Sequence, residues 1–333
     1  MANDSRVRVA LDAMGGDFAP EQVVAGARLA RDELDIEVVL VGRPDALVGA
    51  EDFETISASE VVEMADENAA QSVRRLKDAS VVRGAEAVRD GRAAALVSAG
   101  NTGGAMAAAL LRMGRIKGVV RPAIATPIPV PGSTPTVLLD AGANAECLPA
   151  YLAQFARMGS VFAAQRYRIA EPRVGLLANG EEKSKGTPLV REAHELLAEL
   201  AGINFVGNVE GRDIMTTDVD VVVTDGFTGN VALKTLEGAL RALVRSVFGA
   251  LGSLPADQSE AAIGALLPLA GELDPDGIGG ALLLGVDGVC VISHGSSNAR
   301  AIKSALAVAR DMVAGDLVGH LRAAMAEPGD AVS

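Results

Sequence analysis

Short apolar runs alternate with helical patterns along most of the chain. The runs place Val, Ile, Leu and Ala at consecutive positions, which is typical of strands buried on both faces in a parallel sheet. Helical segments rich in Ala, Leu, Arg and Glu follow several runs, and this alternation predicts βαβ units. We therefore expect an α/β fold with a parallel or mostly parallel sheet. The expected strands cover residues 7–11, 36–41, 93–97, 136–139, 174–177, 203–206, 219–223 and 289–293.

One stretch departs from this alternation. Residues 231–251 and 261–273 have the pattern of two consecutive helices, which predicts a helical hairpin at about residues 231–273. We expect it to pack on the core or at a dimer interface, with reversible contact to a membrane surface as the alternative. Its first helix carries an apolar stripe of Leu233, Leu236, Leu240, Leu243, Val244, Val247, Phe248 and Leu251, opposed by Lys234, Glu237, Arg241 and Arg245.

The length leaves the number of domains open. The 333 residues correspond to about two domains at roughly 150 residues each, although an open α/β sheet also fills this length as one body. We expect a single α/β unit over residues 1–326, with or without two subdomains, and a polar tail at residues 327–333.

Charge and cysteine content exclude several classes of protein. The net charge of −13 argues against a nucleic-acid partner, because binding phosphates through overall charge requires a basic protein. Cys147 and Cys290 are too few for a disulfide framework, and with three histidines they show no metal-ligand spacing. The start is short and polar, and no run approaches a membrane span of about 20 apolar residues, so we expect a cytoplasmic protein without a metal.

Polar, glycine-rich loops follow six of the expected strands. Glycine lets backbone N–H groups approach a ligand, and a following helix start adds unpaired N–H groups and a positive dipole end. Ligands of open α/β sheets bind at the carboxyl ends of strands, so these loops predict one anion site at a shared edge. Turns and N-caps require the same residue types, which is the structural alternative. The loops are residues 11–17, 98–104, 140–144, 179–186, 224–230 and 293–298.

Sharper motifs are absent from the sequence. No G-x-G-x-x-G follows a strand, no G-x-x-x-x-G-K-[ST] is present, and there is no G-x-S-x-G elbow. His194-Glu195 starts like a metalloprotease helix, but Ala198 stands where the second ligand belongs. Assigning a dehydrogenase function to this chain would therefore rest on fold analogy alone.

Read in order, the loops resemble those of the phosphate acyltransferase (PlsX) family of bacterial phospholipid synthesis. The resemblance runs from Val9 to about Ala309 through ALDAMGGDFAPE, VSAGNTGGAMAAAL, RPAIATPIP, VLLDAGANAEC, GLLANGEEKSKGTPLV, INFVGNVEGRDI, TDGFTGNVALKTLEG and GVCVISHGSSNARAIKSAL. The chain departs from the family pattern at Phe18, where histidine is common, and at Leu76 and Ala79, which replace a usual Lys and Ser.

The resemblance implies an activity and a fold. It implies transfer of a fatty acyl group from acyl carrier protein to inorganic phosphate, which gives acyl phosphate for phospholipid synthesis without a cofactor. It also implies a homodimer and a Rossmann-like α/β/α sandwich akin to the isocitrate dehydrogenase and phosphotransacetylase group. The alternatives are an acyl-coenzyme A-dependent phosphate acyltransferase and a non-catalytic sensor of fatty acyl groups or carrier protein.

Candidate site residues follow from the chemistry of such a transfer. Phosphate is partly a dianion near neutral pH and a thiolate leaves readily, so we expect direct attack, with positioning and charge stabilisation dominating. A Cys147 acyl-enzyme is the less favoured route, because packing or capping explains that residue. The expected catalytic residues are His294, Lys183, Lys185, Asn230 and Asp225. The expected phosphate-binding residues are Asn101, Thr102, Gly103, Ser296, Ser297, Asp12, Gly15 and Gly16.

An acidic carrier protein needs a basic docking face on this acidic chain. Arg112, Arg115, Lys117 and Arg121 form one basic cluster, and residues 74–77 contain another, made of Arg74, Arg75 and Lys77. We expect one of them to receive the carrier. Arg241 and Arg245 on the hairpin would instead face anionic lipid, which would hold the protein beside the membrane acyltransferase that uses its product.

Overall fold

The eleven strands found in the described residues form one continuous sheet. The computed structural model describes residues 6–274, 277 and 279–326, so the predicted polar tail at 327–333 lies outside the described residues. The spatial order of the strands is β3-β2-β1-β4-β11-β10-β5-β6-β9-β7-β8. The strands are β1 (Val7–Asp12), β2 (Ile36–Gly42), β3 (Glu54–Ser57), β4 (Ala95–Ser98), β5 (Ala123–Ile128), β6 (Thr136–Leu139), β7 (Arg173–Leu177), β8 (Asn204–Val209), β9 (Val221–Val223), β10 (Ala281–Leu284) and β11 (Val289–Ile292).

The sheet consists of two parallel blocks that run in opposite directions. Strands β3, β2, β1, β4 and β11 are parallel. Strand β10 pairs antiparallel with both β11 and β5, so β5 runs in the direction of β11. Strand β5 then pairs antiparallel with β6, and β9, β7 and β8 continue parallel to β6.

This reversal corrects the prediction that all six polar loops share one edge. The carboxyl ends of β1, β4 and β11 lie at one edge of the sheet, whereas those of β6, β7 and β9 lie at the opposite edge. The reversal depends on β5 and β10, two strands that the hydrophobic pattern did not predict. Strand β5 contains Pro127. Proline lacks a backbone N–H donor, so a proline within an apolar run argues against a central strand.

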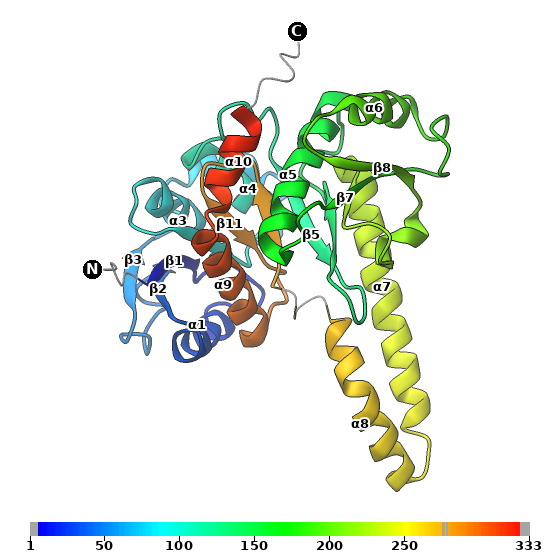
Figure 1. Cartoon of the computed structure of the whole chain (residues 1–333). Helices are drawn as coiled ribbons and strands as arrows, with labels where there is room; N and C mark the ends of the chain where they lie inside the picture. Colours follow the sequence, from blue (N-terminus) through cyan, green and yellow to red (C-terminus); the bar gives the residue numbers. More distant parts are fainter. Residues whose placement is uncertain (1–5, 275–276, 278, 327–333) are drawn as a thin grey trace, which may run out of the picture.

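Helices cover both faces of the sheet and confirm the predicted α/β/α arrangement (Figure 1). One face carries α1 (Glu21–Glu33), α5 (Pro149–Tyr167), α6 (Pro188–Glu199), α9 (Ala299–Ala314) and α10 (Leu317–Ala326). The other face carries α2 (Ala69–Arg75), α3 (Ser80–Arg89), α4 (Thr102–Arg112) and the first half of α7 (Gly226–Leu251). A short 3-10 helix, η1 (Gly211–Met215), precedes β9.

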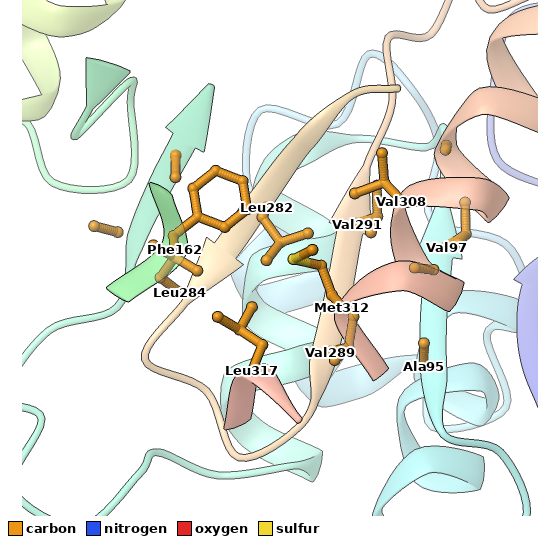
Figure 2. Close-up of a cluster of buried hydrophobic side chains, with 14 of the residues drawn as sticks. Ala95, Val97, Phe162, Leu282, Leu284, Val289, Val291, Val308, Met312 and Leu317 are labelled. Carbon is orange, nitrogen blue, oxygen red and sulfur yellow. The ribbon is translucent and has the colours of Figure 1, made fainter. Parts of the chain in front are cut away.

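Alternation along the central strands divides the core into two layers. Val289 and Val291 of β11 belong to one apolar cluster, whereas Cys290 and Ile292 belong to the cluster on the opposite face. Figure 2 shows the first layer, in which Val308 and Met312 of α9 lie over β11 and Phe162 of α5 lies beside β10. Both faces of these strands are therefore buried, as the apolar runs predicted.

Helices α7 and α8 (Ala256–Glu272) form the predicted hairpin, which projects from the body (Figure 1). Leu233 of α7 is buried, whereas Leu243 is 57% exposed, and none of the residues of α8 is fully buried. The Gly132 N–H donates to Glu272 Oε2 at 3.1 Å, which ties the end of α8 to the β5–β6 loop. Among the described residues, no helix combines the length and apolar composition that crossing a membrane requires.

Candidate active site

The loops after β1, β4 and β11 meet at one edge of the sheet. Asp12 Oδ2 accepts a 2.7 Å hydrogen bond from Ser98 Oγ, and the Asp17 N–H donates to the Gly295 carbonyl at 2.8 Å. A Cβ added at Gly15 would lie 2.6 Å from the Gly100 nitrogen, so the two loops approach closely only because both positions are glycine. Three of the six predicted loops are thereby brought together.

A pocket opens beside this edge, where α7 lies along β5. Its volume is about 130 Å³. Most of its wall is apolar, made of Ile124, Pro127, Ile128, Pro129, Ala141, Leu233, Leu236, Leu240, Ala281 and Ile292. The polar residues that line it are Thr102, Thr126, Asn230, Lys234, Glu237, Ser293 and His294. A mostly apolar pocket with a few convergent polar groups is the usual form of a small-molecule site.

Three charged or titratable side chains meet within the pocket. Glu237 Oε1 lies 3.4 Å from His294 Nε2, and Glu237 Oε2 accepts a 3.0 Å hydrogen bond from Lys234 Nζ. Glu237 is only 6% exposed, whereas Lys234 and His294 reach solvent. Burial alone would raise the pKa of Glu237, but the hydrogen bonds and charges of His294 and Lys234 outweigh it and lower that pKa to about 2. The cluster therefore contains a buried carboxylate that is ionised at neutral pH.

Two members of this cluster were missed by the sequence analysis. The prediction that Glu237 belongs to a polar helix face opposite the apolar stripe is wrong, because the side chain is buried against the pocket. Its position four residues after Leu233 places it on the buried stripe, and this spacing was the available signal. Lys234 also lines the pocket, because its ammonium group pairs with Glu237.

Thr126 is a third missed residue. It lies on β5, and its hydroxyl oxygen is buried without a hydrogen-bond partner in the part of the chain that the structure describes. Buried hydroxyl groups are nearly always paired, so a partnerless one in a pocket wall is a candidate ligand contact. The motif RPAIATPIP contains it, but without the strand assignment nothing indicated the direction of its side chain.

The loop after β4 provides an open helix start. Asn101 caps α4, because its Oδ1 accepts from the Gly104 N–H at 3.0 Å and its Nδ2 donates to the carbonyl oxygens of Met64 and Asp66. Thr102 and Gly103 occupy the first turn of α4 and are exposed, and Thr102 lines the pocket. This first turn presents N–H groups to an anion, whereas the Asn101 side chain is occupied within the protein.

The other predicted phosphate contacts have structural partners. Burial raises the pKa of Asp12, and the hydrogen bond from Ser98 holds its carboxyl group beneath the loops. Ser297 Oγ lies 2.7 Å from Ser293 Oγ in a buried pair, whereas Ser296 is exposed. Gly16, at a φ of 122°, allows the β1 loop to turn beside Gly295.

The remaining predicted catalytic residues belong to the opposite edge. Asp225 caps α7 by accepting from the Thr228 N–H at 2.9 Å, so it does not orient His294. Asn230, one turn into α7, does line the pocket, and its Nδ2 donates to the Ala141 carbonyl at 3.1 Å. Lys183 and Lys185 are exposed on the loop after β7 and are not among the residues lining this pocket.

Neither cysteine has the environment of a nucleophile. Burial raises the pKa of the Cys147 thiol to about 11 and that of the Cys290 thiol to about 12. Cys147 Sγ donates to the Asn144 carbonyl at 3.6 Å, which agrees with the packing interpretation. Within the part of the chain that the structure describes, no three His, Cys, Asp or Glu side chains are grouped to hold a metal ion.

The two basic clusters lie differently with respect to the pocket. Arg112 ends α4, whereas Thr102 begins it, so the cluster of Arg112, Arg115, Lys117 and Arg121 follows the far end of this helix. Arg112 Nε lies 3.6 Å from Glu86 Oε1, and Arg115 donates to the Val120 carbonyl. The cluster of Arg74, Arg75 and Lys77 is exposed at the end of α2, which packs on α4.

Comparison with known proteins identifies a sequence family over nearly the whole chain. The family described as fatty acid synthesis protein matches residues 7–319. A protein of Heliobacterium modesticaldum named phosphate acyltransferase is 48% identical over 328 residues, covering 95% of this chain and 97% of that protein. A protein of the same name from Pelotomaculum thermopropionicum is 46% identical over 334 residues, covering 96% and 95%.

Solved structures share the fold at low sequence identity. A phosphotransacetylase from Streptococcus pyogenes is similar with a TM-score of 0.63 and 18% identity, covering 93% of this chain and 94% of that one. The EutD phosphotransacetylase from Staphylococcus aureus gives a TM-score of 0.62 at 17% identity, covering 92% and 94%. At this level of identity the similarity establishes the arrangement of the sheet and its helices.

Proposed function

Because this chain belongs to the fatty acid synthesis protein family, in which its relatives are named phosphate acyltransferase, we propose that it transfers a fatty acyl group to inorganic phosphate. The donor is a thioester of acyl carrier protein, and the product is an acyl phosphate used in phospholipid synthesis. The observation that carries this proposal is the ionised Glu237 between Lys234 and His294, in an otherwise apolar pocket beside the open start of α4. No cofactor takes part.

Phosphate binds between the first turn of α4 and Lys234. The N–H groups of Thr102 and Gly103 and the positive end of the helix dipole stabilise its charge. Lys234 Nζ supplies a full positive charge from the facing helix. Its partner Glu237 is buried and accepts one of its three N–H donors, which leaves two for phosphate.

His294 moves the proton that the reaction must transfer. A hydrogen phosphate oxygen attacks the thioester carbonyl carbon, the C–S bond breaks, and the phosphate proton ends on the departing thiolate. Because His294 Nε2 faces Glu237, its Nδ1 is left to take that proton and to deliver it to sulfur. The Glu237 carboxylate faces the imidazole and orients it, so Glu237 is a positioning residue.

The buried hydroxyl of Thr126 stabilises the negative charge on the carbonyl oxygen. It has no partner among the described residues and therefore needs no rearrangement to donate. The Asn230 amide, which uses one N–H for the Ala141 carbonyl, offers its second. Removing one such donor costs about 10²- to 10³-fold in rate in comparable sites, so Thr126→Val should lower kcat by about 10²-fold.

The activity is tested by supplying purified protein with palmitoyl-carrier protein and inorganic phosphate and following acyl phosphate by phosphorus NMR. We expect phosphate-dependent acyl phosphate and free carrier thiol in equal amounts. Palmitoyl-coenzyme A in the parallel reaction distinguishes the donors, and a preference for it would contradict the carrier assignment. Failure to form acyl phosphate from either donor, while His294→Asn leaves acyl binding intact, would favour the sensor alternative.

The carrier docks on the basic side chains of Arg74, Arg75 and Lys77, because α2 packs on the helix whose first turn borders the pocket. Replacing these three with glutamate should raise the KM for carrier substrate and reduce its salt dependence. The same replacement at Arg115, Lys117 and Arg121 tests the cluster beyond the other end of α4. A larger effect there would move the docking site to that cluster.

The protein works in the cytoplasm as a homodimer that makes reversible contact with the membrane surface. Leu243, Leu254, Leu267 and Leu269 of the hairpin and its turn are between 41% and 57% exposed, and such surfaces favour a second apolar partner. Sedimentation equilibrium tests the dimer. Flotation with anionic lipid vesicles tests the membrane contact, which Arg241→Glu together with Arg245→Glu should weaken.

A further inference from the structure

Helix α7 carries one stripe that leads from the polar cluster to an apolar hollow in the hairpin. Asn230, Leu233, Glu237, Leu240 and Val244 follow one another at intervals of three and four residues, so they share one helix face. The first four of these line the pocket beside β5. Leu240 and Val244 line a second hollow, against the end of α8. Leu240 therefore lines both hollows.

The second hollow lies between α7 and the end of α8. Its volume is about 360 Å³, and Ala270 and Leu273 form its wall on the side of α8. Arg241, Arg245 and Asp274 complete the lining, and the alkyl stems of the two arginines cover apolar surface while their charged ends stay in water. The Gly132–Glu272 hydrogen bond holds the end of α8 at the β5–β6 loop, next to the strand that forms the first hollow.

We propose that the two hollows together bind the hydrocarbon chain of the acyl substrate, and that Leu240 sets how far the chain extends. The inference rests on the proposed function, since the thioester carbonyl lies at the Glu237–His294 end. From Glu237 to Val244 the helix rises about 10 Å, so an extended chain that starts at the carbonyl passes Leu240 and reaches the second hollow. Each methylene that passes Leu240 should gain about fourfold in affinity by leaving water.

The shape of the first hollow favours a flexible chain over a helix of a second copy. A helix with its side chains is about 10 Å across, and a space of about 130 Å³ between α7 and β5 does not admit one. The hollow is also continuous with a buried carboxylate–imidazole pair, which a docked helix would cover without using.

The test compares two tryptophan variants on the same helix. Leu240→Trp blocks the junction of the hollows, whereas Leu243→Trp, three residues on and 57% exposed, lines neither of them. Both are assayed with phosphate and with butanoyl- and palmitoyl-carrier protein. Leu240→Trp should lower kcat/KM for the palmitoyl substrate by about 10²-fold, as expected for three to four excluded methylenes, and leave the butanoyl substrate, which ends before Leu240, within about twofold. Leu243→Trp should change neither.

An unchanged butanoyl rate also shows that Leu240→Trp is folded. Leu240→Ala is a second variant with the opposite expected effect, a higher ratio of stearoyl to palmitoyl turnover. If Leu240→Trp lowers kcat/KM equally for the short and the long acyl substrate, the inference is overturned. It is also overturned if the variant keeps the wild-type dependence on chain length but no longer forms a dimer in sedimentation. If the wild type transfers neither acyl chain, the proposed function fails. The binding of the hydrocarbon chain is then tested separately by calorimetry with palmitate. Palmitate should then bind to wild type and Leu243→Trp and lose about 10²-fold in affinity with Leu240→Trp, and equal binding to all three would overturn it.

Discussion

The Glu237 carboxylate lies 3.4 Å from His294 Nε2, and this contact joins the projecting hairpin to the centre of the sheet. Glu237 belongs to α7, whereas His294 follows β11, 57 positions further along the chain. Lys234, one turn before Glu237, pairs with the other carboxylate oxygen at 3.0 Å. A single buried carboxylate therefore faces both a lysine of its own helix and the imidazole of the loop after β11.

Replacing Glu237 with Gln should impair catalysis more than substrate binding. The amide keeps the shape of the side chain but removes the carboxylate that faces the His294 imidazole, so we expect kcat to fall by about 10²-fold. The KM for phosphate should change by less than about threefold, because Lys234 keeps its own charge. Steady-state kinetics with both substrates provide this measurement. Glu260→Gln, an exposed change on α8, is the control and should leave both constants unaltered. A rise in KM with normal kcat would contradict the positioning role.

Alanine substitutions of the three candidate phosphate-binding lysines should differ in their effect on the KM for phosphate. Lys234 lines the pocket, whereas Lys183 and Lys185 are exposed on the loop after β7. We expect Lys234→Ala to raise the KM for phosphate by about tenfold, equivalent to one charge-assisted hydrogen bond of about 1.4 kcal/mol. Lys183→Ala and Lys185→Ala should raise it by less than about twofold. A rise with either that equals the effect of Lys234→Ala would place the β7 loop at the working site.

Cys147→Ala should retain acyl transfer. Burial holds the pKa of the thiol at about 11, so little thiolate exists at neutral pH to form an acyl-enzyme. We expect kcat within about threefold of the wild type, and no burst of carrier thiol when phosphate is omitted. A stoichiometric burst in the wild type that Cys147→Ala abolishes would show that a covalent route operates.

Much of the fold followed from the sequence because both faces of the sheet are buried. Continuous apolar runs such as 136–139 and 289–293 agree with β6 and β11 within one residue at either end. Strand β5 was missed because Pro127 interrupts its pattern, and β10 because two glycines precede its four residues. Without these two strands, no sequence pattern revealed that the sheet reverses direction.

The site was predicted less completely for the same reason. The loops after β1, β4 and β11 were correctly expected to meet, since parallel strands place their ends at one edge. Lys183 and Asp225 were grouped with His294 only on the assumption of a uniform direction. The sequence analysis missed Glu237 because a charged residue in an amphipathic helix is usually exposed. Its contact with His294, 57 positions away in the sequence, could not be predicted from the local pattern.

Gly229→Ala should destabilise the protein and disturb the pocket. A Cβ at this position would overlap the Asp140 carbonyl oxygen and lie 3.0 Å from Thr224, so α7 must move away from the sheet. Overpacking of this kind costs about 2 kcal/mol of unfolding free energy, which urea denaturation measures. Gly249→Ala, on the same helix with nothing near its Cβ, should be neutral or stabilising by up to about 1 kcal/mol. Equal stability of the two variants would mean that α7 is not held against Asp140.

The Glu237 pair should also appear in the pH dependence of stability. The folded-state pKa of about 2 lies below the ordinary value of 4.5, so the ionised carboxylate stabilises the fold above the unfolded value, and this stabilisation is lost as pH falls from about 4.5 towards 2. Glu237→Gln has no such proton to bind, and its unfolding free energy should be lower than that of the wild type at neutral pH and should approach it as the solution is acidified. Urea denaturation at a series of pH values across that window measures the difference. Glu260→Gln, exposed on α8, should follow the wild-type curve more closely. A stability gap for Glu237→Gln that stays constant across the window would mean that the buried carboxylate does not hold the pair together.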